Sequence, residues 1–430
     1  MPPPGGTGLR RKPMCSRLLV SLLLAAGLVT RERALNAAAG GVPLTEAEAI
    51  RRGLARPALA DLAAGEVGVA RGDAIQAKLR PNPTLSYSRE ETHGDPSASA
   101  EDYAWLTQSL DIAGRRRLRG EAAARRLEAA IDQTAARHVD VTAEIRHRFA
   151  ETLLAQRKVE ALAAWARQMT RVAQTVAQRE AAGEVSAYDR RRLERERAGA
   201  EARAQVERAA LDRARERLAA LVGEEAAPNQ DYAYVTGELM PPAVVPPVAQ
   251  LVAGLSERPD LHALDATASA AELDARAAGR WWLPEVTVNG GFKTVEVGSE
   301  RASGFLVGAS VPLPVLDRNQ GDAVRAMSRA QLARGQRALE LAKAIGEVRG
   351  LRAESVQLAD TARRFRAEAT GGSAELVRTA EAAYAGGETD ILELLDAHRG
   401  ALDAELQALD LEMGARRARI ELDRAVGAGL

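Results

Sequence analysis

The stretch "WWLPEVTVNGGF", residues Trp281–Phe292, changes character within a few positions. Two adjacent tryptophans and a proline give way to alternating apolar and polar residues from Val286 onward. Alternation with a period of two predicts a half-buried β-strand. Aromatic residues make up only 3% of the chain, so a tryptophan pair at this point is a local concentration. The stretch therefore predicts a strand whose beginning is marked by aromatic side chains.

Four runs share this alternation, and they fall in two windows at about residues 83–110 and 284–313. Each run is long enough to cross a bilayer as a tilted strand, which takes about 9–11 residues. Half of the aromatic residues fall within or beside these windows: Tyr87, Tyr103, Trp105, Trp281, Trp282, Phe292 and Phe305. Such clustering is typical of the interfacial girdle of membrane strands, so these seven are predicted membrane-interface residues. A small soluble sheet packed on helices is the alternative.

The rest of the chain is rich in Ala, Arg, Glu and Leu and is 27% charged, a composition typical of long helices. Apolar residues spaced by three and four, such as Leu162, Trp165 and Met169, indicate coiled-coil packing. Long helices are predicted over about 114–181 and 320–384, and each is followed by a return helix. At 1.5 Å per residue, each would be about 100 Å long.

Sequence landmarks recur at a nearly constant offset. Gly183 and Gly387 are 204 positions apart, and so are Gly223 and Gly427. This repetition predicts a duplicated unit of helix, two strands, long helix and return helix. The predicted segments are a first unit at 40–223 with helices at about 44–79 and 114–222, a Pro-rich linker at 224–255, and a second unit at 256–430 with helices at about 256–281 and 320–426.

The N-terminal residues 1–39 are predicted to be an export signal and its flanking segment. Basic residues precede an apolar stretch at 18–29 that is shorter than the about 20 residues a transmembrane helix needs. An uncleaved anchor is the competing interpretation. Cys15 is the only cysteine, so an intramolecular disulfide is excluded.

Charge and motif content exclude several function classes. Lys plus Arg and Asp plus Glu both total 59, so no global field that would attract nucleic acid exists. The five histidines show no paired metal-ligand spacing, and no phosphate-binding loop or nucleophile motif is present. We therefore expect no catalytic residue, no metal site and no cofactor. Four strands cannot close a barrel in lipid, where about eight is the minimum, so membrane strands predict an oligomer.

The order of elements resembles the TolC-like outer-membrane efflux protein family over nearly all of residues 44–427. The motifs that carry the resemblance are "SVPLPVLDRNQGDA" at 310–323 and "GETDILELLDA" at 387–397. "LTQSLDIAGRRRLR" at 106–119 is similar to the heavy-metal, cobalt-zinc-cadmium branch of the family.

The resemblance implies a mainly α fold with a membrane β-barrel portion. Three chains would contribute four strands each to a 12-stranded barrel in the outer membrane lipid, and their helices would form an α-helical tunnel through the periplasm. The implied partners are two further copies of the chain, a periplasmic adaptor protein and an inner-membrane pump of the RND type. The implied function is passive export of metal cations or small toxic compounds. A soluble coiled-coil scaffold is the alternative.

The resemblance also implies site residues. Glu393 and Asp396 correspond to the acidic pore constriction of the family, and three copies would place six carboxylates around the axis. The turns with Gly183 and Glu184, and with Gly387 and Glu388, correspond to the adaptor contacts. The alternatives are solvated helix carboxylates and ordinary helix reversals.

Overall fold

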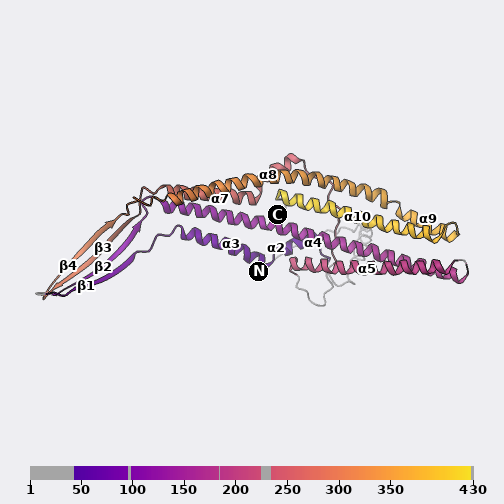
Figure 1. Ribbon diagram of the computed structural model, residues 1–430, viewed down its shortest axis with the longest axis horizontal. Helices are drawn as coiled ribbons and strands as arrows, with labels where there is room; N and C mark the ends of the chain where they lie inside the picture. Colours follow the sequence, from indigo (N-terminus) through magenta and orange to yellow (C-terminus); the bar gives the residue numbers. More distant parts are fainter. Residues whose placement is uncertain (1–42, 95–97, 184, 224–233, 428–430) are drawn as a thin grey trace, which may run out of the picture.

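The computed structural model describes residues 43–94, 98–183, 185–223 and 234–427. They form an elongated body with a β-sheet at one end and long helices along the rest (Figure 1). The predicted export signal at 1–39 and the first part of the predicted linker lie outside the described residues.

The sheet has four strands, β1 (Thr84–Thr92), β2 (Ser99–Leu110), β3 (Val286–Val297) and β4 (Glu300–Ser310). All neighbours are antiparallel in the order β1-β2-β3-β4, so the two strand pairs join through β2 and β3. The four strands lie inside the two windows predicted from the sequence. Strands β1 and β4 are the two edges of the sheet within the described part of the chain.

The first unit contains α2 (Glu46–Leu54), α3 (Pro57–Gln76), α4 (Arg115–Ala181) and α5 (Ala187–Val222). The prediction of one helix over about 44–79 is wrong, because the helix is interrupted before Pro57. Proline lacks the N–H that a helix interior needs and forces the preceding residue out of the helical region, and Arg56 accordingly has ψ of 130°.

The second unit contains α7 (Pro259–Gly279), α8 (Gln320–Phe365), a π-helical turn at Arg366–Thr370, α9 (Ser373–Gly386) and α10 (Ile391–Val426). The prediction of one helix over about 320–384 is wrong, because the π-helical turn and the glycine pair at 371–372 divide it. The predicted linker is also less irregular than expected, because α6 (Val248–Gly254) and a short 3₁₀ turn (Leu255–Glu257) follow its last proline.

The two units repeat one another in backbone detail, which confirms the duplicated fold. Helices α5 and α10 each begin after a capping side chain, and each ends at a glycine in the left-handed region, Gly223 with φ of 80° and Gly427 with φ of 78°. The arginines before Pro57 and Pro259 also match. Arg56 donates to the carbonyl of Ala220 at the end of α5, and Arg258 donates to that of Ala425 at the end of α10, at 2.8 Å.

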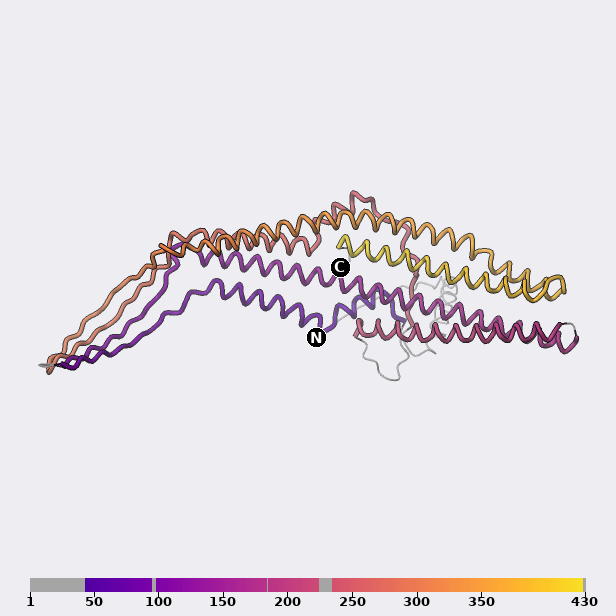
Figure 2. The backbone as a smooth tube through the Cα atoms, viewed as in Figure 1, coloured from indigo at the N-terminus to yellow at the C-terminus, as the bar shows by residue number. Residues whose placement is uncertain are grey.

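The core lies along the length of α4, α5 and α10 rather than in a globule. Figure 2 shows these helices running away from the sheet, and both return turns lie at the opposite end. One cluster contains Ile145, Phe149 and Met413, and another contains Trp165 and Leu394, all at most 7% exposed. Burying each such side chain contributes about 1.5–3 kcal/mol. The spacing of apolar residues predicted from the sequence is thus the buried stripe. In the described ranges, no helix combines the length and apolar character needed to span a membrane.

Candidate functional site

The second return turn, residues 387–390, fixes where α10 begins. Gly387 has φ of 74°, a conformation that glycine adopts without steric cost. The Asp390 carboxylate accepts the backbone N–H of Leu392 at 2.8 Å and of Glu393 at 3.1 Å. This cap uses the carboxylate of Asp390 and leaves the carboxylate of Glu393, in the first turn of the helix, outside the capping interaction.

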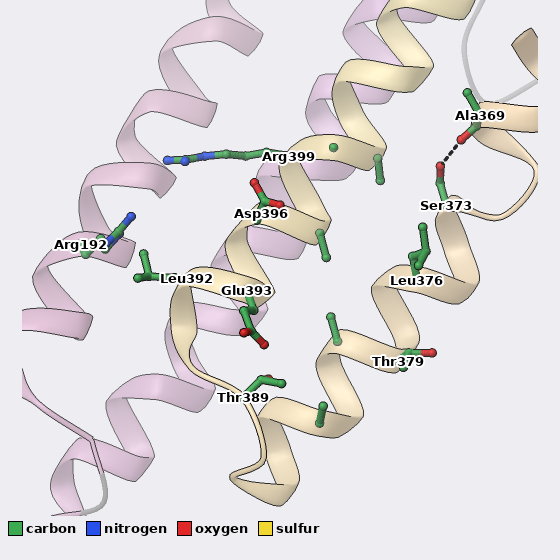
Figure 3. Close-up of a pocket in the computed structure, with 15 residues that line it drawn as sticks. Arg192, Ala369, Ser373, Leu376, Thr379, Thr389, Leu392, Glu393, Asp396 and Arg399 are labelled. Carbon is green, nitrogen blue, oxygen red and sulfur yellow. Dashed lines mark hydrogen bonds between the residues drawn. The ribbon is translucent and has the colours of Figure 1, made fainter.

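Glu393 and Asp396 are both exposed, three residues apart on α10. Neither carboxylate has a hydrogen-bond or ion-pair partner among the residues that the structure describes. Both line a groove of about 890 Å³ that extends to Ala383 of α9. Figure 3 shows them on α10 between α5, which carries Arg192, and α9, which carries Thr379. The two predicted residues therefore lie together beside the turn, and their role in a constriction stays a prediction.

The first return turn has the same backbone and different charges. Gly183 has φ of 77°, and Ser186 caps α5 as Asp390 caps α10. Asp189, at the position of Glu393, accepts a hydrogen bond from the Ser186 hydroxyl at 2.7 Å, so its carboxylate is engaged in the cap. Arg192 stands at the position of Asp396. Only the second turn therefore presents two carboxylates without partners, and Glu184 lies outside the described residues.

Two residues that the sequence analysis missed join the two turns. The Arg179 guanidinium of α4 lies 5.2 Å from the centre of the Tyr384 ring and donates to the Tyr384 carbonyl at 2.8 Å. Tyr384 is 7% exposed, and burial raises the pKa of its phenol. Its hydroxyl has no hydrogen-bond partner in the described part of the chain. An isolated tyrosine before a glycine pair was the one signal in the sequence, and nothing in the sequence indicated its cationic partner.

Arg366, a third residue that the sequence did not point to, stabilises the interruption between α8 and α9. Arg366, in the π-helical turn, donates to Glu405 at 2.6 Å and to Glu412 at 2.8 Å, both on α10. Turns of this type are rare, and they occur often at functional sites. The arginine therefore fixes α10 against the point where α8 and α9 meet.

The strand register separates the predicted membrane-interface aromatics into two groups. Tyr87 and Phe292 both align with Ala104, and Phe305 aligns with Phe292, so these three aromatics share one face of the sheet. Tyr103 and Trp105 flank Ala104 in β2. They lie on the opposite face, because successive side chains of a strand alternate. The register thus divides these five aromatics between the two faces of the sheet, and their contact with the membrane interface stays a prediction.

The tryptophan pair lies in the turn between α7 and β3, where helix gives way to strand as expected. The Arg318 guanidinium lies 5.6 Å from the centre of the Trp281 ring, in range of a cation–π contact. Trp282 is 63% exposed. The pair thus has one ring covered by a cation and one ring left open at the base of the sheet, and its contact with lipid stays a prediction.

In the described segments, no group of three or more His, Cys, Asp or Glu side chains could hold a metal ion.

A family model described as outer membrane efflux protein matches residues 251–428. The cobalt-zinc-cadmium resistance protein CzcC of Cupriavidus metallidurans is 29% identical over 412 residues, which cover 94% of this chain and 91% of that protein.

Two solved structures share the fold. CusC has a TM-score of 0.74 at 19% identity and covers 90% of this chain and 93% of its own. The outer membrane protein VceC of Vibrio cholerae has a TM-score of 0.72 at 20% identity, over 89% of this chain and 96% of its own.

Proposed function

The chain belongs to the outer membrane efflux protein family, and on that premise we propose that it is the outer-membrane channel subunit of a tripartite efflux pump for metal cations. The protein lies in the outer membrane and extends into the periplasm. It works as a homotrimer, with a periplasmic adaptor protein and an inner-membrane pump of the RND type. It acts as a passive exit conduit.

The observation that carries this proposal is the open four-stranded sheet. One of its faces carries a group of exposed apolar side chains, among them Phe305 at 85% and Val307 at 84% exposed, and its charged residues lie toward the tip of the sheet. Unpaired backbone groups at the edges β1 and β4 are costly in lipid, and four strands are too few to close on themselves. Three chains would supply 12 strands and leave no edge. A soluble scaffold would have no use for such a face.

Exposed apolar residues on α8 support the same assembly. Val324, Met327, Leu332 and Leu339 are each at least 60% exposed in the single chain. They lie in the first half of α8, and the side of the helix that packs on the rest of the chain carries small buried residues such as Ala326, Ala330 and Ala333 instead. Neighbouring copies that pack against the exposed apolar residues would complete the wall of the tunnel.

The cargo is proposed from two observations. The full-length relative CzcC is named for cobalt, zinc and cadmium resistance. Glu393 and Asp396 of three copies would place six unpartnered carboxylates around the axis of the tunnel, and such a ring attracts cations and repels anions. Specificity among cations then belongs to the pump, because a conduit open to water does not need to bind its cargo tightly.

The adaptor is proposed to dock at the two return turns, which form the end of the molecule farthest from the sheet (Figure 1). Gly183 and Gly387 give both turns the same shape. Glu388 follows Gly387, and its carboxylate would meet basic residues of the adaptor; Glu184, at the corresponding place in the sequence of the first turn, is proposed as a contact from the family resemblance alone.

Growth of a strain that lacks this protein tests the proposal. We expect higher sensitivity to Co²⁺, Zn²⁺ and Cd²⁺ than in the parent strain, and restoration by a plasmid that carries the intact chain. Unchanged metal tolerance together with new sensitivity to organic drugs would contradict metal export, but it would still support an efflux channel. Unchanged tolerance to every compound would contradict the efflux role.

A further inference from the structure

We infer that Lys293 sets the ion selectivity of the outer part of the barrel lumen, by neutralising one of the carboxylates that face it. This inference rests on the proposed channel function. It concerns a cluster at the end of the molecule opposite Glu393 and Asp396.

The register shows which side chains share the face of Lys293. Lys293 aligns with Tyr103, and Tyr103 aligns with Ser88. The same face carries hydroxyl and amide side chains along the strands: Ser86, Ser88, Thr107 and Asn289. The opposite face carries Leu85, Phe305 and Val307, all highly exposed. Since apolar side chains of membrane strands face lipid, the face of Lys293 is the one that lines the lumen.

Lys293 is held in place by three contacts. Its ammonium lies 2.6 Å from a Glu101 carboxylate oxygen and 3.0 Å from the Tyr103 hydroxyl. The same ammonium is 4.8 Å from the centre of the Tyr103 ring, and the Tyr103 hydroxyl donates to Glu101. Trp105 supports the tyrosine edge-on, with ring centres 6.3 Å apart. The lysine is therefore a fixed charge beside Glu101 rather than a mobile chain in solvent.

The charges on this face are unequal. In the described strands it carries three carboxylates, Glu90, Glu101 and Glu300, and Lys293 is its one basic residue. Glu90 aligns with Glu101 and is closer to the outer end than Lys293. Arg89 and Arg301 lie on the other face. The lumen face thus has a net charge of −2 per chain, and removal of the Lys293 charge would make it −3.

Ionic current through the reconstituted protein tests the inference. Wild-type protein and the variants Lys293→Gln and Glu101→Gln are compared in planar bilayers under a KCl gradient, and the reversal potential gives the ratio of cation to anion permeability. We expect Lys293→Gln to raise this ratio and Glu101→Gln to lower it, each by roughly twofold or more, because charged rings set the selectivity of a pore. Lys293→Arg keeps the charge and should keep the wild-type ratio.

A matched control separates local charge from total charge. Lys343 of α8 forms an exposed pair with Glu340 at 2.8 Å, outside the barrel, so Lys343→Gln removes the same charge elsewhere. An equal shift in Lys343→Gln, or wild-type ratios in Lys293→Gln and Glu101→Gln, would overturn the inference. A wild-type protein that forms no pore would overturn the proposed function, and the inference with it.

Discussion

The two units of the chain share the same turn and cap geometry, and they differ in the charges of their side chains and in the continuity of their long helices. Both return turns place a glycine in the left-handed region, with φ of 77° at Gly183 and 74° at Gly387. Both return helices begin at a side-chain cap, by Ser186 and Asp390. Features that define where helices begin and end are thus retained, because losing a cap costs about 1 kcal/mol wherever it occurs.

The units differ in charge and in helix continuity. Asp189 of the first unit is engaged in its cap and Arg192 adds a positive charge, whereas Glu393 and Asp396 are acidic and without partners in the described structure. Helix α4 is continuous, whereas its counterpart is divided at Arg366. The two copies thus share one fold, and only the second carries the acidic pair that we propose as the mouth of the channel.

The largest effect is expected at the turns themselves. Gly387→Val should abolish efflux, measured as loss of metal tolerance, because a branched side chain would occupy the proposed adaptor surface. It also strains a left-handed position by about 1–2 kcal/mol, which is too little to unfold the chain. Gly183→Val should act in the same way, since its backbone is the same.

Gly386→Ala is the control for this prediction. Its new methyl group would meet only the side chain of Glu388, at 3.8 Å, and its φ is not in the left-handed region. It should leave efflux unchanged. Loss of the assembled oligomer in Gly387→Val, on a native gel, would show that the turn is needed for folding and would remove the case for an adaptor surface.

The proposed acidic mouth should distinguish the two units by its effect on ion selectivity. The double variant Glu393→Gln with Asp396→Asn should lower cation preference severalfold and raise single-channel conductance, because it removes charge from a narrow ring. The equivalent pair in the first unit, Asp189→Asn with Arg192→Gln, should change both quantities far less.

Reversal potentials and current amplitudes in planar bilayers measure both double variants. Equal effects in the two units would show that the mouth draws on both copies alike. Wild-type currents in the Glu393 and Asp396 variant would reject the acidic ring.

A smaller effect is expected where helix continuity differs. Arg366→Gln loses two charge-assisted hydrogen bonds to α10, and since the groups are partly exposed the cost should be about 1 kcal/mol. Arg363→Gln breaks only an exposed pair with Asp360 inside α8 and should cost less. Urea unfolding of the detergent-solubilised protein compares them, and an equal loss would mean that Arg366 is not a clamp between helices.

Local signals in the sequence predicted much of the fold. The offset between Gly223 and Gly427, the alternation in the strands and the narrow apolar stripe each reappear as structure. The break before Pro57 also follows from a local rule that the interpretation of one continuous helix overlooked. These features depend on neighbours within a few residues, which is why sequence reasoning reaches them.

Features that depend on distant partners were not predictable. The contacts of Arg366 join it to Glu405 and Glu412, 39 and 46 positions away, and no local pattern specifies them. The face of Tyr103 depends on the pairing of β2 with β3, across almost two hundred residues of sequence. Of the candidate site, the positions of Glu393 and Asp396 came from the family resemblance, and their lack of partners could be seen only in the structure.

Cross-linking of the sheet edges tests the central claim, that neighbouring chains complete the barrel. Ser86 of β1 and Leu306 of β4 lie at the same level of the sheet, and each is changed to cysteine in a chain with Cys15→Ser. Within one chain the two positions are separated by two further strands, at about 4.7–4.9 Å per step, which is too far for a disulfide.

The cysteine of β4 is placed at position 306, or in further pairs at Gly304 or Gly308, and is combined each time with the cysteine at position 86. Each pair is oxidised in the outer membrane and run on a non-reducing gel. We expect covalent dimers and trimers in at least one register, and monomers in each single-cysteine control. Monomers in every register, from protein that is present in the outer membrane, would contradict it.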